Sequence, residues 1–154
     1  MRTFTIYVMV GVPGSGKSTW IKKNLGENFP VVSRDLIRED LGYAAKGEKI
    51  LGTREQEEAV TKIQNRKIKW FLDRGISFAI DDTNLGKYLS GLIETLRESP
   101  KKPKIIGVVM KTPLSIASKR RLGIPFSVLS GMRKNQLSLD LSFFDKVIFS
   151  KGIN

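Results

Sequence analysis

The sequence predicts an α/β fold in which helices cover both faces of a parallel sheet. Short apolar segments alternate with longer helix-compatible segments along the 154 residues. Each short segment is a nearly continuous apolar run, as in strands that are buried on both faces. In addition, a glycine-rich loop directly follows the first apolar run and opens a helix. In sheets of this kind, ligands bind beyond the carboxyl ends of the strands.

Five segments are expected to form strands because they are short, apolar and rich in β-branched or aromatic residues. In chain order they are residues 3–10, 31–33, 76–80, 104–110 and 146–150. The helices between them allow every connection to be a crossover, so the carboxyl ends of the strands are expected along one edge of the sheet.

Six segments are expected to form helices, on the basis of their apolar spacing and their flanking residues. They are residues 17–25, 36–41, 53–74, 88–98, 115–121 and 125–137. The longest has Thr53 as N-cap and Gln56 three residues later, the arrangement of a capping box. Its buried stripe is expected to consist of Val60, Ile63, Phe71 and Leu72. The glycine- and lysine-rich residues 42–52 are expected to form an exposed connection.

Length and composition predict one domain over residues 1–154. No run of 18 apolar residues could span a bilayer, and the first ten residues lead into the glycine-rich loop, which argues against a cleaved signal. No membrane partner and a cytoplasmic, intracellular location are therefore expected. The chain has neither cysteine nor histidine, which excludes disulfides and leaves carboxylate, lysine or tyrosine as the proton acceptor of any catalysis.

The chain is strongly basic. Its 27 Lys and Arg residues exceed its 15 Asp and Glu residues, giving a formal charge of +12 and a pI near 10.1. Such values are common among nucleic-acid-binding proteins and favour a polyanionic partner. Proteins can also be basic without such a partner, so charge alone leaves both interpretations open.

Residues 11–18 match in full the phosphate-binding pattern G-x-x-x-x-G-K-[ST]. The backbone N–H groups of such a loop surround a triphosphate, while Lys17 supplies charge to its β and γ phosphates and Ser18 a hydroxyl ligand to Mg²⁺. ATP or another nucleoside triphosphate (NTP), with Mg²⁺, is therefore the expected ligand. The loop residues expected to contact it are Gly11, Pro13, Gly14, Ser15, Gly16, Lys17, Ser18 and Thr19.

A second group of polar residues follows the second strand. A hydroxyl that attacks a γ-phosphate needs a carboxylate to accept its proton, and Asp35 is the candidate base. Capping of the next helix by Ser33 or Asp35 explains the same residues equally well. Arg38 lies three residues after Asp35 on the same helix face, where it could hold a substrate phosphate or simply face Asp35 or Glu39 in solvent.

A third group, Asp81-Asp82-Thr83-Asn84, follows the strand expected to lie near the phosphate loop. A carboxylate there can hold Mg²⁺ directly or through water. Successive residues of an extended strand face opposite sides, so only one of Asp81 and Asp82 can face the site, and spacing does not decide which. Either could instead cap the next turn.

A basic segment at residues 119–125 contains Arg120 and Arg121 and is interrupted by glycine and proline. Arginines on a mobile segment can close over a triphosphate and stabilise the charge that develops during transfer, so this segment is expected to form a lid. The alternative is an ordinary helix end whose cations complement the helix dipole.

Four segments, residues 11–20, 33–38, 81–85 and 119–129, together resemble the kinase domain of the phage T4-type polynucleotide 5′-hydroxyl kinase family. The resemblance covers nearly the whole chain in the family's order. It implies a P-loop kinase-like parallel sheet with a helical lid. It also implies action on 5′-hydroxyl ends of DNA or RNA in nucleic-acid repair, in the host cytoplasm if a phage encodes the protein.

The resemblance assigns roles to individual residues. It implies that Asp35 activates the 5′-hydroxyl and that Arg38 holds the 3′-side phosphate of the acceptor. It favours Asp82 over Asp81 as the functional carboxylate, with Ser18 and Asp82 at the metal. The residues implied in acceptor binding are Arg34, Asp35, Arg38, Asp82, Thr83, Asn84 and Ile124, the last of which packs against the terminal base.

In the lid, Arg120 matches the family's first arginine, which engages the donor phosphates. Arg121 is its immediate neighbour, whereas family members have their second arginine several residues away. The family's Asp-x-Asp-x-Thr phosphatase motif is missing from the sequence, so no phosphatase domain is expected.

The expected function is transfer of the γ-phosphate of an NTP to a 5′-hydroxyl end, with Asp35, Lys17 and Arg120 as the catalytic residues. One rival is a P-loop kinase of a small hydroxyl compound such as a metabolite, nucleoside, sugar or antibiotic. The other is a non-catalytic module that binds nucleotide or nucleic acid and switches conformation.

Overall fold

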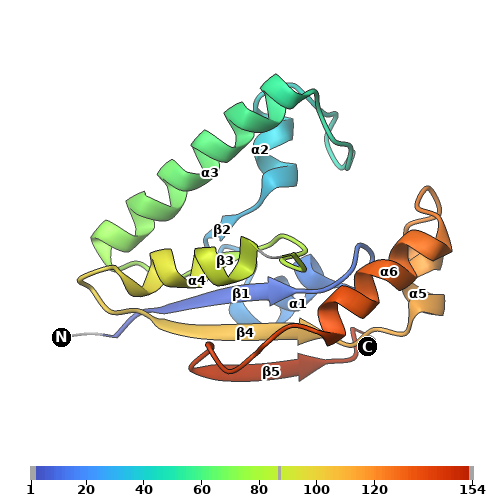
Figure 1. Ribbon diagram of the computed structural model, residues 1–154. Helices are drawn as coiled ribbons and strands as arrows, with labels where there is room; N and C mark the ends of the chain where they lie inside the picture. Colours follow the sequence, from blue (N-terminus) through green and yellow to red (C-terminus); the bar gives the residue numbers. More distant parts are fainter. Residues whose placement is uncertain (1–2, 87, 153–154) are drawn as a thin grey trace.

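The sheet at the centre of the fold contains five parallel strands in the order β2-β3-β1-β4-β5, within the described residues 3–86 and 88–152 of the computed structural model (Figure 1). The strands are β1 (Thr5–Val10), β2 (Val31–Val32), β3 (Phe78–Ile80), β4 (Lys104–Met110) and β5 (Lys146–Ser150). The predicted α/β class and the all-parallel sheet are confirmed.

Helices lie on both faces of this sheet, as predicted. The helices are α1 (Lys17–Leu25), α2 (Arg34–Asp40), α3 (Arg54–Arg74), α4 (Tyr88–Arg97), α5 (Leu114–Arg120) and α6 (Phe126–Leu137). The larger buried cluster joins one face of the sheet to side chains of α3, α4, α5 and α6, and the smaller one joins the other face to α1. Figure 1 shows α4 on one side of the sheet and α1 on the other.

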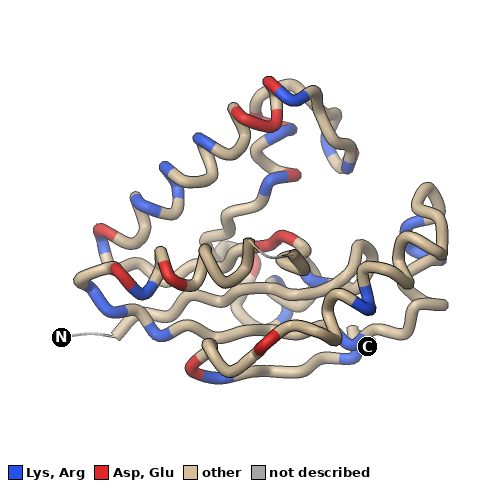
Figure 2. The backbone as a smooth tube through the Cα atoms, viewed as in Figure 1, with Lys and Arg blue, Asp and Glu red and all other residues tan. Residues whose placement is uncertain are grey.

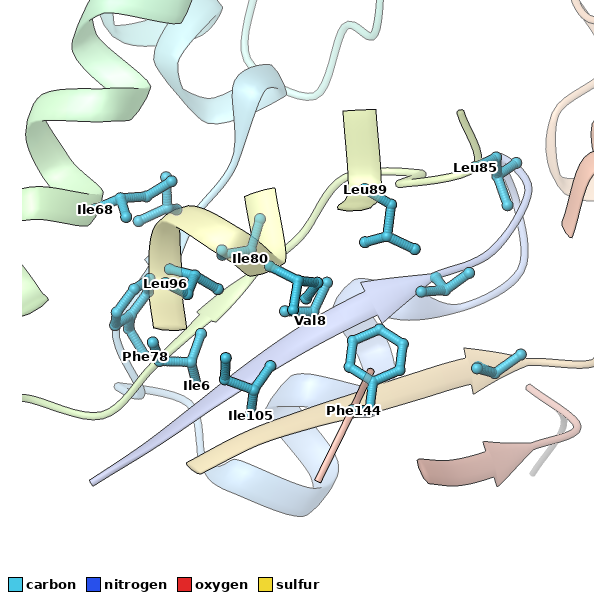
Figure 3. Packing of buried hydrophobic residues seen from close by; sticks show 14 of the residues in the cluster. Ile6, Val8, Ile68, Phe78, Ile80, Leu85, Leu89, Leu96, Ile105 and Phe144 are labelled. Atoms are coloured by element: carbon cyan, nitrogen blue, oxygen red, sulfur yellow. The ribbon is translucent and has the colours of Figure 1, made fainter. Parts of the chain in front are cut away.

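Alternation along the strands explains this two-sided core. In β1, Ile6 and Val8 belong to the larger cluster, while Met9 belongs to the smaller one. In Figure 3, Ile6 and Val8 lie among side chains of β3, β4 and α4, including Phe78 and Leu96. Every strand residue in β1, β3 and β4 therefore has a buried or half-buried environment, apart from the first residue of β4, and this accounts for the continuous apolar runs in the sequence.

The register of β1 with β3 determines where the polar strand exits lie. Val8 pairs with Ile80, and beyond the strands the N–H of Gly11 donates a hydrogen bond to the carbonyl of Thr83 at 3.1 Å. The phosphate loop and residues 81–84 therefore begin side by side at the carboxyl edge of the sheet.

The helix boundaries agree with the sequence prediction to within two residues at each end. Helix α2 begins at Arg34 rather than residue 36, because the hydroxyl of Ser33 accepts a hydrogen bond from the N–H of Leu36 at 3.4 Å and caps the helix. The capping box of α3 is confirmed, with Thr53 and Gln56 bonded to each other's backbone N–H groups.

The buried stripe of α3 differs in part from the prediction. Val60 and Leu72 are buried as expected, whereas Ile63 and Phe71 are only half-buried, and Ile68 is buried in addition. Among the described helices, none combines the length and apolar character that a bilayer crossing requires.

Replacing Phe78 by alanine should destabilise the fold by about 3–5 kcal/mol, because its fully buried ring stacks on Phe71 with a centroid distance of 5.1 Å. Phe126→Ala is the matched control, since that ring is 56% exposed and its loss should cost about 0.5 kcal/mol or less. Urea unfolding of the two variants measures this difference, and equal destabilisation would contradict the core described above.

Candidate active site

The phosphate loop joins the end of β1 to the start of α1. Gly14 and Gly16 have φ values of 81° and 91°, a left-handed conformation that side chains other than glycine rarely adopt. Gly16 is also the N-cap of α1. The first turn of a helix presents backbone N–H groups that have no partner within the helix, together with the positive end of its dipole. The loop therefore has the backbone geometry of an anion-binding site.

Lys17 lies across this loop. Its ammonium group donates to the carbonyls of Gly11 at 3.2 Å and Val12 at 3.1 Å. The pKa of Lys17 is lowered from 10.5 to about 8, mainly by burial. The charge of Asp81 opposes this decrease, the charge of Lys49 adds to it, and Asp82 and Asp35 oppose it more weakly. The negative charge of a bound triphosphate would favour the protonated, positively charged form of Lys17.

Ser18 and Asp81 form the closest polar contact at the mouth of the loop. The hydroxyl of Ser18 donates to Oδ2 of Asp81 at 2.6 Å. Hydroxyl and carboxylate oxygens are the hard ligands that Mg²⁺ prefers, and Mg²⁺ usually binds one or two protein groups together with phosphates and water. This pair therefore fits the ion, while no cluster of three or more acidic ligands occurs in the described part of the chain.

Asp82, the carboxylate that the family resemblance favours, has different partners. Its Oδ1 accepts the backbone N–H of Arg34 at 3.1 Å, and its Oδ2 accepts the side-chain amide of Gln64 at 2.6 Å. Burial raises the pKa of Asp82 above its usual value, although these two hydrogen bonds oppose the increase. The carboxylate of Asp82 is thus bonded toward α2 and α3, and Asp81 is the one bonded to Ser18.

Thr83 and Asn84 join the strand exits to each other. The carbonyl of Thr83 accepts the N–H of Gly11, and the side-chain amide of Asn84 donates to the carbonyl of Met9 at 2.7 Å. Asn84 has a φ of 52°, a conformation that asparagine tolerates better than most residues. These contacts fasten the third polar group to the first strand.

Asp35 lies in the first turn of α2, bonded to Arg38. Nη1 of Arg38 donates to Oδ1 of Asp35 at 3.0 Å, and the side chain of Asp35 remains 40% exposed. The side chain of Arg38, by contrast, is only 8% exposed. Of the two interpretations of Arg38, a solvated arginine is therefore wrong, although the contact with Asp35 that this interpretation included is present.

Glu57 of α3 holds the other side of the Arg38 guanidinium. Nε and Nη2 of Arg38 donate to its two carboxylate oxygens at 2.9 and 2.5 Å, and the backbone N–H of Gly52 adds a third bond at 3.2 Å. The hydrogen bond from Arg38 is the main cause that lowers the pKa of Glu57 to about 2. Glu57 therefore stays ionised at all ordinary pH values, and it fixes the Arg38 guanidinium on the side opposite Asp35.

Arg34 belongs to the same network. Its guanidinium donates to Thr61, Gln64 and Glu57, all on α3. A chain of hydrogen bonds therefore runs from Asp82 at the end of β3, through α3, to Asp35 on α2.

The predicted lid, residues 119–125, runs from the end of α5 to the start of α6, and it touches the phosphate loop. Arg120 donates to the carbonyls of Gly14 at 3.1 Å and Gly152 at 2.9 Å. Arg121 and Ile124 line the cavity that is described next, and Ile124 also packs against the larger core. The structure therefore brings Arg120 to the phosphate loop.

One cavity of about 1420 Å³ connects most of the predicted site residues. Its walls come from the phosphate loop, α1, the start of α2, the exit of β3, the lid, and Gly47 and residues 49–51 of the connection before α3. Of the predicted site residues, Gly11, Ser15 and Asn84 do not line it. The predicted site residues that line it include Lys17, Ser18, Asp35, Arg38, Asp81, Asp82, Thr83, Arg120, Arg121 and Ile124. A donor triphosphate and an acceptor hydroxyl can meet in this space.

Glu57, Gln64 and Lys49, which the structure places in the polar network or at the cavity, are not predicted by any of the sequence motifs. Glu57 and Gln64 lie on α3, 19 and 26 residues after Arg38, and belong to no short motif. Lys49 lies in a segment that looked like an exposed connection. One feature of the sequence could have indicated Glu57 and Gln64: these polar residues share the face of α3 that carries the apolar residues Val60 and Ile68.

Nucleotide affinity should fall as the pH rises above about 8, because the free protein must then take up a proton at Lys17 on binding. The dissociation constant should increase by up to about tenfold per pH unit. Lys17→Arg should bind with a flat profile between pH 7 and 9.5, since arginine stays charged. Titration calorimetry measures both slopes, and equal slopes would show that Lys17 does not contribute its charge.

Comparison with known proteins agrees with this geometry. The family model of the AAA domain, AAA_33, matches residues 6–121, which includes the phosphate loop, α2 and the β3 exit. No curated protein matches the sequence.

Solved structures share the fold. A chain in the Pnkp1/Rnl/Hen1 complex is 26% identical, with a TM-score of 0.64 over 78% of this chain and 40% of that chain. A chain in the Pnkp1/Rnl/Hen1 RNA repair complex is 24% identical, with a TM-score of 0.71 over 91% of this chain and 48% of that chain. A sugar kinase from Janibacter sp. HTCC2649 is 20% identical, with a TM-score of 0.56 over 96% of this chain and 86% of that chain.

The chain thus spans less than half the length of the chains that it matches in the two Pnkp1 complexes. Its five-stranded parallel sheet with helices on both faces is P-loop kinase-like, and its phosphate loop implies that it binds a nucleotide. By the match over residues 6–121, the chain belongs to the AAA domain family.

Proposed function

We propose that the chain transfers the γ-phosphate of ATP or another NTP, with Mg²⁺, to the 5′-hydroxyl end of DNA or RNA. The observation that carries this proposal is that Asp35 lines the same cavity as Lys17 and the Ser18–Asp81 pair. A proton acceptor, a phosphate-binding loop and a metal-binding pair in one cavity are the components of a phosphoryl transfer site.

In the proposed reaction the 5′-oxygen attacks the γ-phosphorus while the bond from that phosphorus to the β,γ-bridging oxygen breaks. Asp35 accepts the proton of the hydroxyl, and the nucleoside diphosphate leaves. Lys17 and Arg120 stabilise the negative charge on the transferring group and the leaving oxygen. Mg²⁺ would neutralise charge on the β and γ phosphates.

The contact at 2.6 Å favours Ser18 and Asp81, rather than Ser18 and Asp82, as the residues that hold this ion. Asp82 then serves the acceptor side indirectly, because it binds Gln64 and the backbone of Arg34 at the start of α2.

Arg38 has the geometry to hold an acceptor phosphate. Its three bonds to Glu57 and Asp35 use three of the five guanidinium N–H donors. The two remaining donors can bind a phosphate oxygen beside Asp35. This leaves the acceptor's 5′-hydroxyl next to the carboxylate that takes its proton.

A polynucleotide acceptor is supported by the charge of +12 and by the likeness to a chain of an RNA repair complex at 24–26% identity. Lys and Arg residues occur along α3, in the connection before it and in the lid, as Figure 2 shows. Such a surface would attract a nucleic acid strand in a salt-dependent manner. A role in nucleic-acid repair inside the cell follows from this proposal.

A kinase of a small hydroxyl compound is the second candidate. It is favoured by the match in size to the sugar kinase, of which the chain covers 86%. Such a kinase would share the NTP-binding site with a polynucleotide kinase and differ only in the acceptor-binding site. Assaying a set of different acceptors therefore separates the two candidate functions.

With γ-labelled ATP or GTP, the protein should label a 5′-hydroxyl oligonucleotide and leave sugars, free nucleosides and aminoglycosides unlabelled. An oligonucleotide that already carries a 5′-phosphate is the matched control and should take up no label. Label on a small compound alone would overturn the polynucleotide proposal and favour the second candidate.

Asp35→Asn should lower kcat by about 10²–10⁴-fold, because asparagine keeps the shape of the side chain but accepts no proton. The dissociation constant for ATP should stay within about twofold, since the phosphate loop is unchanged. Asp40→Asn is the control, as Asp40 is an exposed residue of the same helix that does not line the cavity. Full turnover by the Asp35 variant would point to a different base, whereas absence of turnover in the unmodified protein would favour the non-catalytic binding module.

A further inference from the structure

The connection between α2 and α3 lines one part of the cavity, and three hydrogen bonds hold it in place. It starts where the N–H of Tyr43 donates to the carbonyl of Arg38 at 2.8 Å. Midway, the N–H of Gly47 donates to the carboxylate of Glu39, and at the end the N–H of Gly52 donates to Glu57 at 3.2 Å. The connection is therefore fastened to the same α2–α3 network that holds Arg38 and Asp35.

Three consecutive residues of this connection, Lys49, Ile50 and Leu51, line the cavity that also contains Lys17 and Asp35. Ile50 is 49% exposed and Leu51 is 79% exposed, although both are large apolar residues. No described residue forms an ion pair with Lys49. The acceptor side of the cavity thus has an unpaired cation directly beside two uncovered apolar side chains.

This combination matches the chemistry of a nucleotide within a strand. A backbone phosphate can pair with the ammonium of Lys49, and the face of a base can cover Ile50 and Leu51 and remove their apolar surface from water. A sugar or an aminoglycoside offers neither an anionic group nor a broad apolar face. The segment therefore favours a strand over a small polar acceptor.

We propose that Lys49, Ile50 and Leu51 bind the acceptor nucleotide that follows the reacting one on its 3′ side. This rests on the proposed function and adds a second nucleotide-binding position to it. Arg38 holds the phosphate nearest the reacting end, and Lys49 holds the next phosphate. Ile50 and Leu51 contact the base of the nucleotide that lies between these two phosphates. The protein then distinguishes strands from single nucleotides by this segment.

The chain offers a matched control for each variant. Lys49→Gln is compared with Lys46→Gln, which removes the same charge from the same connection at an exposed residue that does not line the cavity. Leu51→Ser is compared with Leu137→Ser, which removes a 74% exposed leucine at the end of α6, also outside the cavity. All four side chains are exposed, so the fold should be retained.

The test compares a nucleoside 3′-phosphate with a 5′-hydroxyl tetranucleotide as acceptors. Lys49→Gln and Leu51→Ser should raise KM for the tetranucleotide by about fivefold. Leu51→Ser should leave KM for the nucleoside 3′-phosphate and for ATP unchanged, because these do not reach the segment. Lys49→Gln should likewise leave KM for the nucleoside 3′-phosphate unchanged, and its KM for ATP is measured separately because the charge of Lys49 also acts on Lys17. Both control variants should behave as the unmodified protein with every substrate.

The salt dependence of strand binding gives a second measurement that does not require phosphoryl transfer. Binding of a fluorescent tetranucleotide is measured by anisotropy, without NTP, over a range of salt concentrations. The slope of log K against log salt should be smaller in Lys49→Gln by about 0.7, the contribution of one phosphate contact on a single strand. Lys46→Gln should keep the full slope.

Two outcomes would overturn the inference while leaving the proposed function intact. In one, the cavity-lining variants match their controls on the tetranucleotide. In the other, they lose the same factor on the nucleoside 3′-phosphate and on the tetranucleotide. Failure of the unmodified protein to phosphorylate or bind any strand would overturn the proposed function, and this inference with it.

Discussion

The parallel pairing of β1 with β3 is the constraint on which the whole site depends. The pairing of Val8 with Ile80 and the hydrogen bond from Gly11 to Thr83 carry the exit of β3 to the phosphate loop. Only with this register does Asp81 reach Ser18. A slip of one residue would exchange the two sides of the strand and exchange the partners of Asp81 and Asp82. The apolar faces of β1 and β3, buried on both sides, specify the register strongly.

From this edge the polar network also extends toward α2 and α3. Asp82 holds the start of α2, and Glu57 of α3 holds Arg38, which in turn holds Asp35. An ion pair as buried as Arg38–Glu57 adds little net stability, because desolvation offsets its attraction. Its effect is geometric, since it fixes a guanidinium and a carboxylate at one wall of the cavity. Asp35 and Arg38 are thus oriented by residues of α2, α3 and the exit of β3.

The sequence was sufficient for the strands, the helices and the phosphate loop because each has a local signal. Alternation, glycine positions and the Thr53–Gln56 cap involve neighbours within a few residues. The partner of Ser18 was not a local property, since it depends on how the exit of β3 lies beside β1, and the structure shows that it is Asp81. That Asp82 is the functional carboxylate stays a prediction of the family resemblance. The sequence also did not indicate Glu57 and Gln64 as partners. They contact Arg34 and Arg38 of α2 and Asp82 at the exit of β3, which lie 18 to 30 positions away in the sequence. Arg38 shows the same limit: its spacing from Asp35 gave the pair, and only the tertiary structure gave its burial.

The most direct test of the account is a structure of the protein with Mg²⁺, a non-hydrolysable ATP analogue and a 5′-hydroxyl strand. We predict a carboxylate oxygen of Asp35 at about 2.6–3.2 Å from the 5′-oxygen, which faces the γ-phosphorus, with Ser18 and Asp81 at the metal. A 5′-oxygen that approaches a different proton acceptor, or a strand bound away from the wall formed by Asp35 and Arg38, would contradict it.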